Sequence, residues 1–129
     1  ILFCGPLNLK DTVGTKTDNK YLKFFVNTVA WSLTGERNWQ SSPAIEQASL
    51  VDRLTKDYPP TYITDANSYS FEDQGIAFAN KLNSLGVETK SLFFKNSTKQ
   101  INHEYQFNFT TDEAKESFSL TVDFVKLHM

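Results

Sequence analysis

The stretch TYITDANSYSFEDQGIAFANKLNSLGVETKSLFF, residues 61–94, decides the fold class of this protein. TYIT at residues 61–64 predicts a compact buried strand. Apolar residues then recur on one face of a helix over residues 71–84, and Gly86 lies just beyond its end. VETKSLFF at residues 87–94 predicts the next strand. A strand, a helix and a strand with short links predict an α/β fold with parallel strands and flanking helices.

Strand and helix patterns continue upstream of this stretch. ILFC at residues 1–4 predicts a short buried strand that ends at Gly5. Apolar residues with helical spacing run through residues 20–33. Ser42 followed by Pro43 predicts the start of a second, shorter helix. With 129 residues the chain is expected to form at most one domain, and it has no internal repeat and no low-complexity tract.

A final helix is predicted to run to about Leu127, after a loop that contains His103. We expect Thr110 and Glu113 to form a capping box at its start, since threonine and glutamate at this spacing can satisfy free backbone N–H groups of the first turn. The inward face of this helix is expected to carry three apolar residues, Phe118, Val122 and Val125.

The composition is that of an ordinary globular protein. Apolar residues make up 40% and charged residues 22% of the chain, and the net charge is −2. No basic excess indicates nucleic-acid binding, and no apolar run approaches the roughly 18 residues of a membrane span. Cys4 is the single cysteine, which excludes an internal disulfide, gives no zinc-type spacing and favours a reducing, cytoplasmic location. No cofactor or metal is therefore expected.

The beginning of the chain is unusual. Its only methionine is Met129, so the sequence starts without an initiator residue. It also starts directly on the apolar run ILFC, with no polar residues in front of the predicted strand. We therefore expect the chain to be a piece of a longer protein.

Several of these segments together form a pattern found in a known family. They are YPPTYIT at residues 58–64, FEDQGIAFANKLNSLGVETKSLFF at residues 71–94, and a following loop with a histidine before a closing helix. CGP at residues 4–6 and SSP at residues 41–43 fit the same template. The ordered series resembles the C-terminal part of α/β-hydrolases, most closely the hormone-sensitive-lipase-like esterases and lipases. The resemblance implies that residues 1–129 are the C-terminal fragment of a single α/β-hydrolase domain.

By this resemblance His103 stands at the position of the catalytic-triad histidine. Its imidazole would accept the proton of a serine nucleophile and later deliver it to the leaving group. Glu104 departs from the family pattern, in which a small residue follows this histidine. The second histidine, His128, lies in the last helix beside the end of the chain, and we expect it to have no catalytic role.

The triad acid is not where the family pattern has it. Tyr69 occupies the corresponding position, and a tyrosine cannot hold an imidazolium as a carboxylate does. Two nearby carboxylates are candidates instead. Glu72 lies in the first turn of the predicted helix and is favoured, and Asp65 at the end of the preceding strand comes second.

Other assignments of the acid stay open. Asp73 matches a second acidic position of the family that serves structure, and it is well placed to cap the amino terminus of the helix. Some hydrolases of this fold take the acid from the strand before, which would point to the region of Asn8 and Asp11. All of these side chains can equally be solvated loop residues without a catalytic role.

The nucleophile is missing from these residues. The family requires G-x-S-x-G, a sharp strand-to-helix turn that exposes the serine hydroxyl. None of the five glycines of the chain takes part in such a motif, and no glycine-rich oxyanion loop is present. Because the chain order in this fold is serine, acid, histidine, both parts would precede Ile1.

The resemblance therefore implies a serine esterase or lipase that hydrolyses a small-molecule carboxylic ester. This chain would supply the triad histidine and acid, and would be inactive by itself. Its expected partners are the missing N-terminal half of the domain and, through an exposed sheet edge, further copies of itself. The alternative is a catalytically inactive binding or scaffolding protein of the same fold. Tyr69 and Glu104 favour this alternative, and His103 opposes it.

Overall fold

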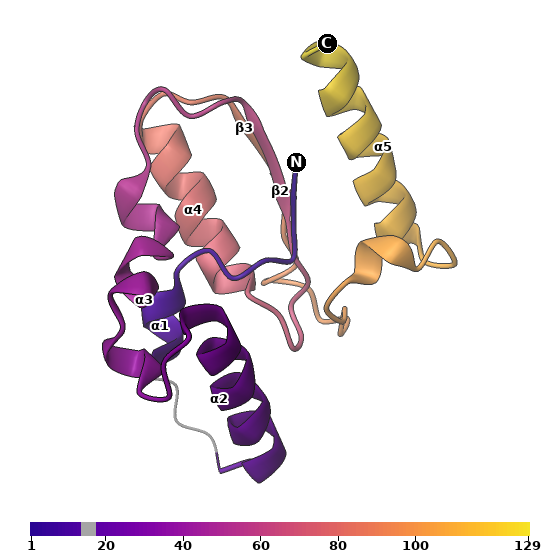
Figure 1. Ribbon diagram of the computed structural model, residues 1–129. Helices are drawn as coiled ribbons and strands as arrows, with labels where there is room; N and C mark the ends of the chain where they lie inside the picture. Colours follow the sequence, from indigo (N-terminus) through magenta and orange to yellow (C-terminus); the bar gives the residue numbers. More distant parts are fainter. Residues whose placement is uncertain (14–17) are drawn as a thin grey trace. The chain divides into compact units, whose positions relative to one another are not determined.

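The computed structural model describes residues 1–13 and 18–129 and contains two compact units. The sheet unit comprises Ile1–Leu7 and Leu54–Met129, and the helical unit comprises Asn8–Arg53. The two units are described separately below, and Figure 1 gives the course of the chain through each of them.

The sheet unit is built on three parallel strands in the order β1-β2-β3. They are β1 (Leu2–Phe3), β2 (Thr61–Thr64) and β3 (Thr89–Leu92). Every residue of the central strand β2 is buried, as expected for a parallel strand covered on both faces. The predicted α/β class with parallel strands is confirmed, although β1 is shorter than the predicted strand.

Helix α4 (Glu72–Ser84) connects β2 to β3 and packs against both strands. Phe78 and Leu82 are fully buried on its inner face. Gly75 permits close contact with the strands, because a Cβ atom at this position would lie 2.9 Å from Cε1 of Phe93. The helix ends as predicted, since Gly86 adopts a positive φ of 75° that favours glycine.

Helix α5 (Asp112–Leu127) lies on the other side of the strands from α4, as Figure 1 shows. The predicted capping box is wrong by one residue. The hydroxyl of Thr111, not of Thr110, accepts the N–H of Ala114 and caps the helix. The hydroxyl of Thr110 instead donates to Asn108 Oδ1 at 2.6 Å, and the Glu113 carboxylate pairs with the ammonium group of a lysine at 2.5 Å.

The predicted inward face of α5 is also wrong in part. Phe118 and Val125 are exposed. The buried positions are three others, Ala114, Ser117 and Phe124. The buried stripe passes through Ser117 because its hydroxyl lies 3.2 Å from the phenol oxygen of Tyr62 on β2, which satisfies both buried groups.

A small apolar cluster holds the loop that carries His103. Ala66, Ile101 and Tyr105 are buried together, and Leu92 and Phe94 pack against them. Tyr105 opens a short 3₁₀ helix, Tyr105–Phe107, and its phenol oxygen lies 2.6 Å from Thr64 Oγ1 at the end of β2. The loop after β3 is thereby tied to the end of the central strand.

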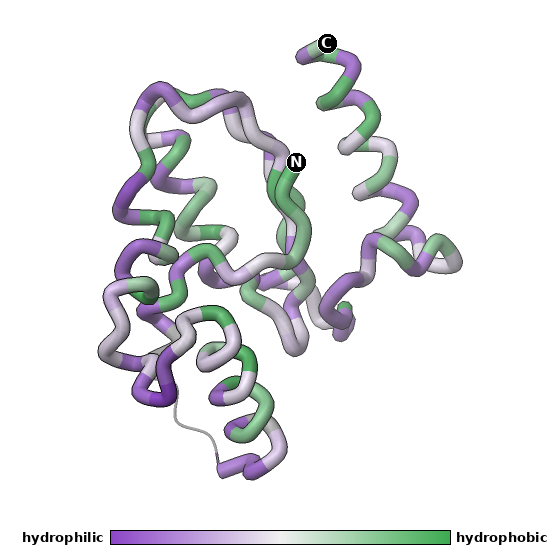
Figure 2. The backbone as a smooth tube through the Cα atoms, in the orientation of Figure 1, coloured by the Kyte–Doolittle hydropathy of each residue, from purple (hydrophilic) through white to green (hydrophobic). Residues whose placement is uncertain are grey.

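The helical unit contains α1 (Leu9–Val13), α2 (Lys20–Thr34) and α3 (Pro43–Gln47). Two 3₁₀ helices, Trp39–Ser41 and Leu50–Arg53, complete it. The predicted helix start at residues 42–43 is confirmed, because Ser42 accepts the N–H of Ala44 and Pro43 is the first helical residue. Figure 2 shows hydrophobic residues spaced along α2 and through the N-terminal strand of the sheet unit.

Candidate functional site

Three chemically reactive side chains meet at the carboxyl ends of the parallel strands. Cys4 directly follows β1, Asp65 directly follows β2, and His103 lies in the loop after β3. One ligand-type atom of each residue lies within 4.8 Å of those of the other two. In open parallel sheets this edge is where ligands bind.

The imidazole of His103 faces the carboxylate of Asp65. Its Nδ1 atom lies 3.5 Å from Asp65 Oδ1, and the two side chains are 31% and 3% exposed. The two groups form an ion pair when the histidine is protonated, but the arrangement lacks the geometry of a hydrogen bond. The ring edge of Phe71 supports the imidazole, with 5.9 Å between ring centroids. The prediction that a carboxylate from residues 65–73 lies within reach of His103 is confirmed.

The Asp65 carboxylate is held by backbone groups. Its Oδ1 accepts the N–H of Ala66 at 2.7 Å, and its Oδ2 accepts the N–H of Phe71 at 2.9 Å. Both donors belong to the segment between β2 and α4, so the turn itself fixes the direction of the carboxylate. A buried carboxylate with two charge-assisted hydrogen bonds is well suited to orient a neighbouring imidazole.

Glu72, the favoured acid of the sequence analysis, makes different contacts. Its side chain is buried, and Oε1 accepts the backbone N–H of Phe94, which follows β3. Burial raises the pKa of Glu72, and the backbone N–H groups of Phe94 and Lys95 offset part of that rise. Glu72 therefore ties α4 to the end of β3, and the geometry favours Asp65 as the partner of His103.

Glu72→Gln is expected to alter the pH dependence of folding stability. Because burial raises the pKa of Glu72 above its ordinary value of 4.5, the folded chain retains a proton that the unfolded chain releases. The contribution of Glu72 to the free energy of unfolding is thus complete below that ordinary value and is lost as pH rises through the raised value. Glutamine keeps the oxygen that accepts the N–H of Phe94 but does not titrate.

Urea unfolding of both proteins from about pH 4 to about pH 7 measures the effect. The stability of the Gln variant relative to the wild type should increase with pH over this range and then level off. Parallel stability curves for the two proteins would contradict the assignment of a raised pKa to Glu72.

The other positions considered for the acid make different contacts. Tyr69 is 88% exposed and has a positive φ of 53°. Asp73 lies in the first turn of α4, but Phe71 and not Asp73 is the N-cap residue, and the Asp73 carboxylate pairs with Lys95 at 2.6 Å. Asn8 and Asp11 belong to the helical unit, where the Asn8 amide donates to the Asp11 carboxylate at 2.6 Å.

Cys4 and Gln106 are site residues that the sequence analysis did not identify. The Cys4 thiol donates to Gln106 Oε1 at 3.2 Å, and burial raises the pKa of this thiol to about 12. The metal-free thiol is therefore protonated near neutral pH and is no nucleophile. Cys4 could have been found from the sequence, since it ends a predicted strand of the same parallel sheet and such strand ends converge.

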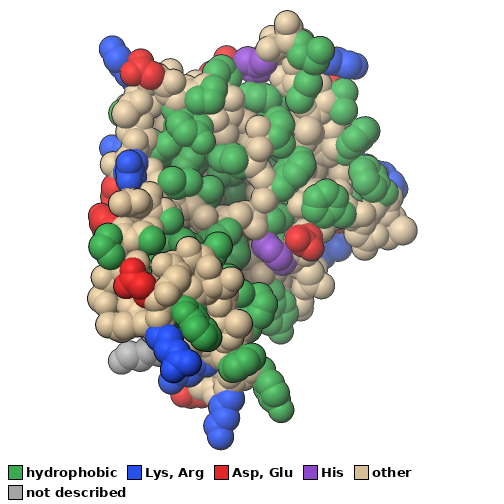
Figure 3. Space-filling model, viewed as in Figure 1, with side chains coloured by type: hydrophobic (Ala, Val, Ile, Leu, Met, Phe, Trp, Pro, Cys, Tyr) green, Lys and Arg blue, Asp and Glu red, His purple; other side chains and the backbone are tan. Residues whose placement is uncertain are grey.

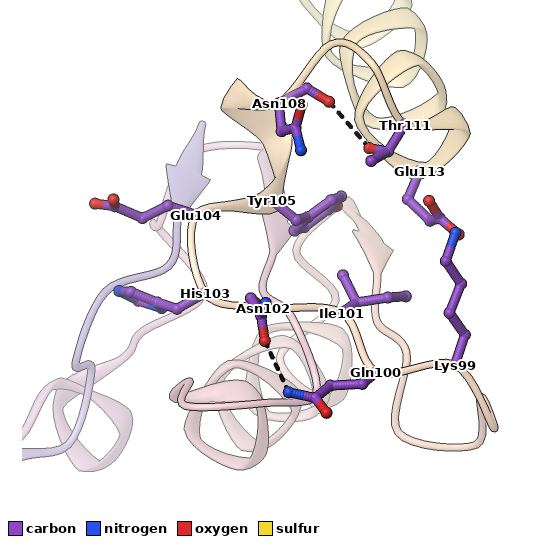
Figure 4. Close-up of a pocket in the computed structure, with 10 residues that line it drawn as sticks. All are labelled: Lys99, Gln100, Ile101, Asn102, His103, Glu104, Tyr105, Asn108, Thr111 and Glu113. Atoms are coloured by element: carbon purple, nitrogen blue, oxygen red, sulfur yellow. Dashed lines mark hydrogen bonds and ion pairs between the residues drawn. The ribbon is translucent and has the colours of Figure 1, made fainter.

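A small pocket of about 210 Å³ adjoins the His103 loop. Figure 4 shows that the His103 and Glu104 side chains point away from the pocket residues Asn108 and Thr111. The lining consists mainly of polar and charged side chains, and the volume is below the roughly 300 Å³ at which ligand pockets begin. The pocket does not suit an acyl chain.

Comparisons of the chain with protein-family models, with curated proteins and with solved structures found no match. No helix in the described part of the chain combines the length and apolar character that a membrane span requires. The case for a function therefore rests on the residues at the strand ends and on their chemistry.

Proposed function

We propose that this chain is the C-terminal part of a serine hydrolase of carboxylic esters, an α/β-hydrolase similar to the hormone-sensitive-lipase-like group. In this proposal His103 is the catalytic base and Asp65 is the triad acid. The observation that carries it is the pairing of a half-exposed imidazole with a buried carboxylate at the carboxyl edge of a parallel sheet.

The proposed chemistry assigns a different task to each ring nitrogen. Nδ1 faces Asp65, which orients the imidazole and stabilises the imidazolium that forms. Nε2 accepts the proton of the serine hydroxyl while the serine oxygen attacks the ester carbonyl. The same proton then passes to the leaving alcohol, and a water repeats the sequence to release the acid. The 3.5 Å separation must shorten by about half an ångström for a full hydrogen bond in the transition state.

The serine and the oxyanion donors must come from outside these residues, because the sequence contains no G-x-S-x-G. The sheet offers a place for the missing part of the domain. β1 is an edge strand, and no other described strand pairs with its second edge. Ile1 and Phe3 are 47% and 37% exposed along it, and Figure 3 shows apolar side chains gathered on the face in view. An open apolar edge favours pairing with the N-terminal half or with another copy.

A catalytically inactive binding or scaffolding protein of the same fold is the second candidate. Its support is the exposed Tyr69 at the position of the family's acid, together with the long contact between His103 and Asp65. In that case the pair would be a remnant of an ancestral site without a nucleophile.

One experiment separates the two candidates. The coding sequence upstream of Ile1 is read, and the chain is expressed with and without the upstream segment. An upstream G-x-S-x-G and turnover of p-nitrophenyl acetate by the longer polypeptide are expected, while the 129-residue chain alone should not exceed free imidazole. An upstream segment without the serine motif would establish the inactive alternative. If the purified 129-residue monomer hydrolyses the ester and His103→Ala abolishes this activity, the proposal that the nucleophile lies in the upstream segment is wrong.

A further inference from the structure

The cluster at the strand ends contains a sulfur, a nitrogen and an oxygen that can all bind a metal ion. Cys4 Sγ, an Asp65 carboxylate oxygen and a His103 ring nitrogen lie within 4.8 Å of one another. Each comes from a different segment of the sheet unit, and the strands bring them to one point. Among these residues Asp65 is fixed by two backbone N–H groups, so one ligand is held in place in advance.

Two buried nitrogen atoms beside this cluster lack hydrogen-bond partners. They are Nδ1 of His103 and Nε2 of Gln106, and neither is accessible to solvent. The nearest polar atom described for Nδ1 is the Asp65 oxygen at 3.5 Å, which does not satisfy it. The Gln106 residue is only 6% exposed, and the other end of its amide contacts the Cys4 sulfur. The Nδ1 atom of His103 is the one of the two that can bind a metal ion, because an amide nitrogen such as Nε2 of Gln106 only donates hydrogen bonds. A buried ring nitrogen without a partner is explained by a bound ion or water.

We propose that Cys4, Asp65 and His103 bind a divalent zinc ion. Zinc takes thiolate, imidazole and carboxylate ligands in tetrahedral sites, and a water can fill the fourth position. Magnesium and calcium are excluded by the sulfur and nitrogen ligands, since both prefer oxygen alone. Zinc–ligand bonds of about 2.0–2.3 Å place the ligand atoms about 3.5 Å apart. Because the three atoms lie within 4.8 Å of one another, each separation needs to shorten by about 1.3 Å at most.

The side-chain amide of Gln106 contacts the sulfur of Cys4. Its amide oxygen accepts from the protonated thiol at 3.2 Å in the metal-free chain. A zinc ion takes the place of the thiol proton, which is released to the solvent, and a half-turn of the amide then directs Nε2–H at the thiolate. Such N–H donors commonly support a coordinated ligand.

Zinc at this position would also prevent His103 from acting as the catalytic base. Coordination through Nδ1 leaves the proton of the neutral imidazole on Nε2, which then cannot accept another from a serine. Zinc would therefore inhibit the intact hydrolase, and only this consequence rests on the proposed function. Metal binding by the 129-residue chain does not depend on the proposed hydrolase function.

The test is a titration of the chelator-treated 129-residue chain with Co²⁺ as a spectroscopic substitute for zinc. One equivalent should produce a thiolate-to-cobalt charge-transfer band, which Zn²⁺ then displaces. Because Cys4 is the only cysteine, Cys4→Ser should remove the band completely. His103→Ala should weaken cobalt binding at least about tenfold.

His128→Ala is the matched control, since it removes the only other histidine. His128 lies near Glu88, 3.4 Å from its carboxylate, and its loss should leave the titration unchanged. Absence of the band at one equivalent in the wild type overturns the proposal without recourse to any variant. A band of equal affinity in His103→Ala overturns it as well, because the cysteine then binds metal by itself. One equivalent of Zn²⁺ should also raise Tm in the wild type and not in Cys4→Ser.

Discussion

His103→Ala is expected to lower kcat for a short activated ester by about 10⁴-fold or more, in the polypeptide that joins this chain to the upstream serine. The loss is large because the serine hydroxyl is a weak nucleophile until a base removes its proton. His103 is the half-exposed imidazole that faces a buried carboxylate, and alanine leaves no group to accept that proton. The measurement is the steady-state hydrolysis of p-nitrophenyl acetate with a chelator present, so that metal binding does not interfere.

Two comparisons make this result specific. His128→Ala should retain wild-type turnover, because His128 contacts Glu88 and the carbonyl of Phe124 near the end of α5. Asp65→Asn should lose turnover to a similar degree as His103→Ala, whereas Glu72→Gln should lose much less. A larger loss of turnover in Glu72→Gln than in Asp65→Asn would show that Glu72, and not Asp65, is the triad acid. Unchanged turnover in His103→Ala would exclude the triad altogether.

Phe78→Ala is expected to reduce the free energy of unfolding by about 3–5 kcal/mol. Phe78 is fully buried on α4, and the ring of Tyr58 meets it edge-on with 5.6 Å between centroids. Alanine would leave a cavity under a helix that packs on two of the three strands, and the rigid sheet cannot collapse into it. Urea unfolding followed by far-UV circular dichroism measures the change.

An exposed phenylalanine of the same chain supplies the control. Phe24 on α2 is 73% exposed, so Phe24→Ala should change the free energy of unfolding by no more than about 0.5 kcal/mol. Phe78→Leu, which keeps most of the buried volume, should lose less than about 1.5 kcal/mol and remain measurable if the alanine variant does not fold. Equal losses in Phe24→Ala and Phe78→Ala would contradict the assignment of the core.

The central elements of the fold were predictable because their signals are local. The run at residues 61–64, the apolar face of residues 71–84 and the glycine at position 86 each identify a structure from neighbouring residues alone. The inward face of α5 was not predictable in this way. Ser117 is buried because of a hydroxyl on β2, and no local pattern indicates so distant a partner. The cap is at Thr111 and not at Thr110 because the helix begins at Asp112, so that Thr111 is the residue directly before it.

The candidate site was predictable only as far as strand ends could be located. His103 and the acidic segment at residues 65–73 follow from the order of strands and loops. The choice between Asp65 and Glu72 could not be made from that order, because it depends on which carboxylate accepts the N–H of Phe94 after β3. Cys4 was not identified from the sequence because Asp65 and His103 lie far from it along the chain, whereas metal motifs are usually identified by short spacings.

The parallel order of the three strands has a consequence for how the chain folds. No two neighbouring strands are joined by a hairpin, so each pairing requires the closure of a long loop, and the loop between β1 and β2 is the longer of the two. Such topologies fold slowly compared with helical bundles. We expect β2, α4 and β3 to assemble first and β1 to join afterwards. Cys4 would then reach Asp65 and His103 only at the end, so the full cluster marks completed folding.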